Sequence, residues 1–203
     1  MTFKKQIPSL HDIQIGDILV SRYQFSDWAN RFPWEDWHHV ALVTKINPLT
    51  IIEAVGQNEK GQSEGPTEIL FEDSIAFGKA DDLQDIVWLR PIFPNPIRGM
   101  ESRWVRSSRR KIISEMEARK RVVGFARDQI GEPYTWQATK WSEGRWYCSL
   151  LIYKSYSRSV TDMYLETYLA VRGGFFVTPE DILKSKRTQR YFAWPANTFK
   201  NEE

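Results

Sequence analysis

Apolar and polar residues alternate in short runs through the first half of the chain, a pattern typical of β-strands. The runs predict strands at residues 17–22, 39–44, 50–55, 67–71 and 85–90. Turn-forming residues separate them, notably Asn47-Pro48 and the polar, glycine-containing stretch at 56–66. We therefore expect this half to form an antiparallel meander.

The second half changes to helical periodicity. Within residues 111–130, apolar side chains recur at helical spacing at Met116, Val123, Ala126 and Ile130. Gly131 and Pro133 would end this helix. A second helix is predicted at 148–156, and a third from Thr178, whose hydroxyl can cap the helix. Strands followed by helices predict an α+β fold, in which an antiparallel sheet from the N-terminal half packs with helices from the C-terminal half.

Size and charge limit the function classes. With 203 residues we expect a single domain over 1–203. The chain has 28 basic and 26 acidic residues, a net charge of +2, so no overall field favours nucleic acid. Residues 98–121 are locally basic and could touch phosphates or anionic lipid head groups, but a solvated linker and helix face is the favoured interpretation.

The first residues lack the apolar core of a secretory signal, and no apolar run approaches about 18 residues. We therefore expect no transmembrane segment. The expected localisation is cytoplasmic, or outside the cell by a signal-independent route such as contact-dependent secretion. The oligomeric state is not readable from the sequence.

Cys148 is the only cysteine, and it stands where a polar turn runs into an apolar stretch of helical spacing. The unpaired amides at a helix start favour a thiolate at such a position. Without further context, a lone cysteine beside Leu150 and Leu151 is more often a small buried hydrophobe. The nucleophile hypothesis therefore needs a base.

His39 and Glu53 are candidates for the base and its orienting carboxylate. They lie at the ends of two apolar runs, and their even separation allows both side chains on one face of a hairpin that turns at 45–49. His38 would point to the opposite face from His39. Metal binding has little support, because there is one cysteine and the adjacent histidines lack a ligand-like spacing.

Aromatic residues gather near these candidates. The segment 25–37 carries five aromatic residues, together with Asp27, Glu35 and Asp36, immediately before the histidine pair. We interpret it as one lip of a cleft, with Trp37 and Asp36 as tentative substrate contacts; a packed surface loop is the alternative. Trp136, Trp141 and Trp146 lead into Cys148 and are expected to divide between core and cleft wall.

Six short motifs occur in an order that resembles a known family. They are Gly16-Asp17-Ile18-Leu19, His39-Val40-Ala41-Leu42-Val43, Ile51-Ile52-Glu53-Ala54, Ile130-Gly131-Glu132-Pro133-Tyr134, Tyr147-Cys148-Ser149 and Thr178-Pro179-Glu180-Asp181-Ile182. The order resembles the circularly permuted branch of the NlpC-type papain-like cysteine hydrolases, the YaeF/YiiX-like group, in which the cysteine follows the histidine. Leu150 is a departure, since relatives often carry a polar residue there.

The resemblance implies a permuted papain-like (NlpC-type) fold and hydrolysis of an amide through a thioester, without a cofactor or metal. Cys148 would attack, His39 would act as base and acid, and Glu53 would orient the imidazole. The backbone amide of Cys148 and the side chain of Tyr134 would meet the oxyanion. The implied substrate is a peptide or amide, with a cell-wall muropeptide as leading candidate. Two alternatives stay open: a lipid acyl hydrolase or acyltransferase of the same class, and a non-catalytic binding module.

Overall fold

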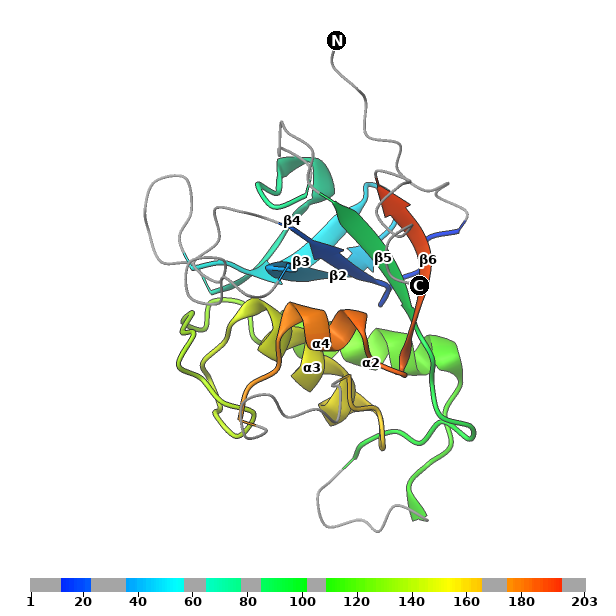
Figure 1. The fold of residues 1–203 in the computed structure, drawn as a ribbon. Helices are drawn as coiled ribbons and strands as arrows, with labels where there is room; N and C mark the ends of the chain where they lie inside the picture. Colours follow the sequence, from blue (N-terminus) through cyan, green and yellow to red (C-terminus); the bar gives the residue numbers. More distant parts are fainter. Residues whose placement is uncertain are drawn as a thin grey trace.

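A computed structural model describes residues 12–22, 36–56, 65–77, 85–101, 109–165 and 175–194. Within these ranges the strands form one six-stranded antiparallel sheet in the order β4-β3-β2-β1-β5-β6 (Figure 1). The strands are β1 (Ile18–Ser21), β2 (His39–Lys45), β3 (Thr50–Ala54), β4 (Pro66–Leu70), β5 (Ile86–Pro91) and β6 (Thr188–Trp194). Chain order and sheet order therefore agree from β1 to β4, after which β5 returns to the free side of β1.

The helices gather against one face of this sheet (Figure 1). They are α2 (Glu115–Arg127), α3 (Cys148–Ser159) and the short α4 (Pro179–Leu183), and a 3-10 turn η1 (Phe71–Asp73) follows β4. Ser114 caps α2 by accepting a hydrogen bond from the Glu117 amide. Thr178 and Asp181 form a reciprocal capping box at the start of α4. The predicted cap of the third helix is thus confirmed.

Strand alternation divides the core into two layers. On the helix side, Val20, Val40 and Leu42 belong to a cluster with residues of α2 and α3. On the other side, Leu19 and Ala41 belong to a second cluster that Phe71 and Phe77 complete. Both faces of the central strands are therefore buried, and the sheet can support polar side chains only where a partner satisfies them.

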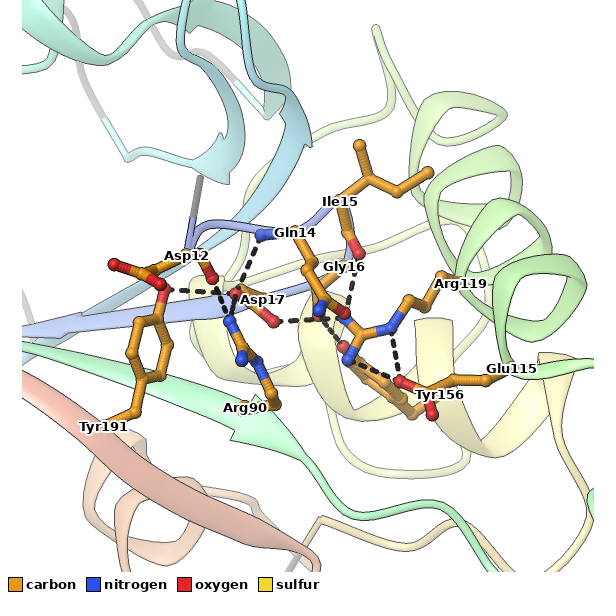
Figure 2. Close-up of polar contacts among 10 residues, drawn as sticks. All are labelled: Asp12, Gln14, Ile15, Gly16, Asp17, Arg90, Glu115, Arg119, Tyr156 and Tyr191. Atoms are coloured by element: carbon orange, nitrogen blue, oxygen red, sulfur yellow. Dashed lines mark hydrogen bonds and ion pairs between the residues drawn. The ribbon is translucent and has the colours of Figure 1, made fainter. Parts of the chain in front are cut away.

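Two expectations from the sequence are wrong. The strands do not all precede the helices, because β6 follows α4 and pairs with β5. The α+β class stands, but the last strand of the sheet comes from the C-terminal end of the described chain. The predicted first helix is also too long, since α2 ends at Arg127 and Ile130 lies beyond it. Val123 and Ala126 are buried as predicted, whereas Met116 is 54% exposed. The buried face of α2 instead includes the charged Arg119, which binds Asp17 (Figure 2).

Among the described residues, none of the helices combines the length and the apolar character that crossing a bilayer requires.

Candidate active site

Two adjacent strands place His39 and Glu53 at the same end of the sheet. Ala41 pairs with Glu53 in the antiparallel β2–β3 ladder, and His39 lies two residues before Ala41, at the first position of β2. Residues two apart on a strand share a face, so His39 and Glu53 are diagonal neighbours across the ladder. The expectation that their even separation lets both side chains meet fits this register.

The two side chains are in direct contact. His39 Nε2 lies 2.7 Å from Glu53 Oε2, and the two residues are only 5% and 2% exposed. The ring of Phe77 packs against the imidazole with centroids 5.6 Å apart. A buried carboxylate is costly unless it is paired, so the histidine satisfies Glu53 at this position. The sequence offered no signal for Phe77.

Cys148 is the first residue of α3, and its neighbour Tyr147 is the N-cap. The Tyr147 side chain makes no capping hydrogen bond, and the first intrahelical bond of this end runs from the Leu151 amide to the Tyr147 carbonyl. The preceding amides of the helix therefore have no intrahelical acceptor. Cys148 itself is 2% exposed. A helix start that carries a thiol and uncapped amides is suited to stabilising negative charge.

The side chains of Cys148 and Glu53 both act on the His39 ring. Burial lowers the pKa of His39, but hydrogen bonds to the side chains of Cys148 and Glu53, together with their charges, raise the pKa from 6.5 to about 10. Glu53 meets the ring at Nε2, and the Cys148 side chain acts on the same imidazole. The structure thus brings the three residues that the sequence selected into one site.

The three tentative substrate contacts, Tyr134, Asp36 and Trp37, differ in how exposed they are. Tyr134 is half-buried and forms an isolated bridge with Trp146, two residues before Cys148. Asp36 is exposed. Trp37 is 2% exposed and lies in the core with the Arg22 guanidinium 5.1 Å above its ring, a placement that does not favour direct contact with a substrate. The rest of the expected lip, residues 25–35, lies outside the described residues.

The three tryptophans before Cys148 were expected to divide between core and cleft wall; the core position is confirmed for Trp146, and a cleft wall stays a prediction. Trp146 is 1% exposed and stacks edge to face with Phe125, whereas Trp141 is 65% exposed. Trp141 meets Phe175 edge to face, with centroids 5.2 Å apart, and Phe175 is itself 49% exposed. Trp136 is half-buried. The segment before the thiol therefore carries one buried indole and one exposed aromatic pair.

Comparison with known proteins relates this chain by its fold. No protein-family model matches the sequence, and no curated protein matches it. Among solved structures, the chain is similar to one described as the metalloprotein yiiX from Escherichia coli O157:H7, DUF1105. The TM-score is 0.60 at 16% identity, over 88% of this chain and 96% of that one. The chain therefore has a YiiX-like α+β fold.

The description of yiiX as a metalloprotein raises the question of a metal here. Among the described residues, no group of three or more His, Cys, Asp or Glu side chains is arranged to hold a metal ion. Ligands of one ion must point at a common centre, and Cys148, His39 and Glu53 do not form such a group, so these three residues do not fit a metal site.

Proposed function

We propose that the protein is a cysteine hydrolase of the permuted papain-like, NlpC-type class that cleaves an amide bond. The observation that supports this most is the His39 ring between Cys148 and Glu53. A thiol at a helix start, an imidazole and a carboxylate that fixes the imidazole are the groups that nucleophilic acyl transfer requires. A buried structural cysteine needs neither partner.

The chemistry proceeds in two steps. The Cys148 thiolate attacks the amide carbonyl, and protonated His39 gives its proton to the leaving amine as the C–N bond breaks, which leaves a thioester. His39 then takes a proton from water, whose oxygen attacks the thioester and releases a carboxylic acid and the thiolate. Glu53 holds the proton on Nε2 and stabilises the imidazolium. The uncapped amides of α3, with Tyr134 beside them, would receive the oxyanion.

Amide and lipid substrates make different demands on the cleft. A peptide or muropeptide needs polar partners for its amides and carboxylates, while an acyl chain needs a continuous apolar trough. The acidic residues just before His39, of which Asp36 lies among the described residues and is exposed, favour an amine-bearing substrate. We therefore rank amide cleavage above lipid deacylation.

The test incubates purified protein with peptidoglycan, with small peptide amides and with phospholipid vesicles. We expect soluble peptide fragments or amide cleavage that Cys148→Ala abolishes, and intact vesicles. Ser155→Ala is the matched control, because Ser155 is also buried in α3 and, among the described residues, its hydroxyl donates to the Leu151 carbonyl of its own helix. Fatty-acid release that depends on Cys148, without amide cleavage, would instead support the lipid hydrolase. No turnover and no thiol activation would favour the binding module.

A further inference from the structure

The two residues that flank Cys148 both bind the backbone of Val177. The Tyr147 hydroxyl oxygen accepts a hydrogen bond from the Val177 amide at 3.1 Å. The Ser149 hydroxyl donates to the Val177 carbonyl at 2.9 Å. All three residues are 0% exposed, so each bond is shielded from water. Side chains from both sides of the nucleophile thus hold one residue, 28 positions beyond Ser149 in the chain.

Val177 is itself held firmly on both sides. Thr178, the next residue, accepts a bond from the Asp181 amide at 3.1 Å and donates its own amide to the Asp181 carboxylate at 2.9 Å. On the other side, the Phe175 carbonyl accepts a bond from the Lys140 amide at 2.9 Å. Because the residue after Val177 and the residue two before it are hydrogen-bonded in this way, Val177 can serve as a reference point for α3.

We infer that Tyr147 and Ser149 are positioning residues, which set the Cys148 thiol against His39 by holding the first turn of α3 to Val177. This inference rests on the proposed function. The first turn of a helix frays most easily, and the Tyr147 side chain does not cap it. A displacement of about 1 Å at a reacting group can cost on the order of a hundredfold in rate. The two bonds to Val177 restrain that displacement from both sides of the sulfur.

The test removes each hydroxyl separately, with Tyr147→Phe and Ser149→Ala. The readout is the pH profile of Cys148 alkylation by iodoacetamide, followed by mass spectrometry. Access to the 2% exposed residue scales the rate at every pH alike, so the shape of the profile reports the contact with His39. We expect both variants to lower the rate at pH 6, relative to the rate at pH 9, about five- to tenfold. Ser155→Ala should change this ratio less than about twofold, since its hydroxyl bonds within the helix.

Tyr147→Phe keeps the aromatic ring and decides the question if Ser149→Ala does not fold. Profiles of both variants that coincide with that of Ser155→Ala would overturn the positioning role. A wild-type profile like that of a free thiol, unchanged by His39→Ala, would overturn the proposed function instead. The two failures are therefore distinguishable in one set of measurements.

Discussion

At the scale of single residues, the charge of His39 depends on which of two opposing effects is larger. Burial of the ring disfavours the imidazolium, whereas the side chains of Cys148 and Glu53 favour it. The partners prevail, and the pKa rises to about 10. His39 should therefore carry a proton at neutral pH and keep it until the pH approaches about 10. The imidazolium form is the one that can stabilise a thiolate and later protonate a leaving amine.

The first prediction at this scale is that His39 titrates far above an ordinary histidine. Followed by NMR, its ring signals should shift near pH 10 in the wild type. In Glu53→Gln the midpoint of the His39 titration should fall, because the carboxylate that raises the pKa of His39 is lost while the ring stays buried. The chain has three histidines, so single variants assign the signals.

Glu68→Gln is the matched control for that titration. Glu68 is a carboxylate on the adjacent strand β4, but it bonds Arg127 and Thr44 rather than the imidazole. Its loss should leave the His39 midpoint in place. A wild-type midpoint near 6.5 that Glu53→Gln does not move would contradict the proposed pairing.

At the scale of elements, the local sequence pattern predicts where a strand lies but not which distant strand it pairs with. The first five strands were predicted within one residue at each end, because alternating apolar side chains are a local signal. β6 was missed, since its sequence Thr-Gln-Arg-Tyr-Phe-Ala-Trp does not alternate cleanly and it lies at the edge of the sheet. The pairing of β6 with β5 is a long-range contact, which local sequence does not encode.

The buried face of α2 contains a charged residue that the apolar pattern did not predict. The pattern assumed that buried positions are apolar, which is right for Val123 and Ala126 but wrong for Met116, which is 54% exposed. Arg119 is in fact 1% exposed, because Asp17 lies 3.0 Å from it and satisfies its charge. A charged residue in the core becomes visible only when its partner is known, and Asp17 is 102 positions away in the chain.

In the candidate site, too, the local sequence predicts some features and tertiary packing determines the others. Strand parity was enough to bring His39 and Glu53 to one face, and the helix start was enough to single out Cys148. The contact between α3 and the beginning of β2 depends on tertiary packing, as does the binding of Val177 by Tyr147 and Ser149. The sequence therefore supplies the candidate reacting groups, while the residues that we propose to position them become visible only in the fold.

The prediction at this scale compares two helix caps. Thr178→Ala and Ser114→Ala each remove a hydroxyl that accepts a bond from a helix amide, at α4 and α2 respectively. Each should lower the free energy of unfolding by about 1 kcal/mol in urea titrations. Only Thr178→Ala should speed hydrogen exchange of the Val177 amide, because Thr178 adjoins Val177. Equal exchange rates in both variants would mean that the α4 cap does not help to hold Val177.

At the scale of the whole molecule, a buried ionic cluster ties the sheet to the helices (Figure 2). Its centre is Asp17, which is 0% exposed and immediately precedes β1. Arg119 from α2, Arg90 from β5 and Tyr191 from β6 all reach its carboxylate, at 3.0, 3.2 and 3.1 Å. The cluster therefore joins three strands to a helix.

The turn before β1 makes this cluster possible. Gly16 has a φ of +78°, a left-handed conformation that favours glycine, and its carbonyl accepts a hydrogen bond from the Tyr156 hydroxyl of α3. Arg119 also donates to the Ile15 carbonyl at 2.9 Å. The backbone carbonyls of the turn thus accept hydrogen bonds from side chains of α2 and α3, while the turn directs the Asp17 side chain inward.

The cluster and the candidate site lie at opposite ends of β1. Asp17 precedes the strand, whereas Ser21 at its other end pairs with His39. Four residues of extended chain span about 13 Å. Stability and thiol activation should therefore be separable by substitution at the two ends.

The last prediction uses this separation. Asp17→Asn keeps the shape of the side chain but leaves the buried Arg119 with the half-exposed Glu115 as its remaining carboxylate partner. The free energy of unfolding should therefore fall by about 3 kcal/mol in urea titrations. Glu117→Gln is the matched control: Glu117 pairs with Arg121 at 2.9 Å on the exposed face of α2, and its loss should cost less than about 1 kcal/mol. Folded Asp17→Asn should keep the wild-type pH profile of Cys148 alkylation. An equally small loss in both variants would show that the cluster stabilises no more than a surface pair does, and a changed profile would show that it acts on the site through Tyr156 and α3.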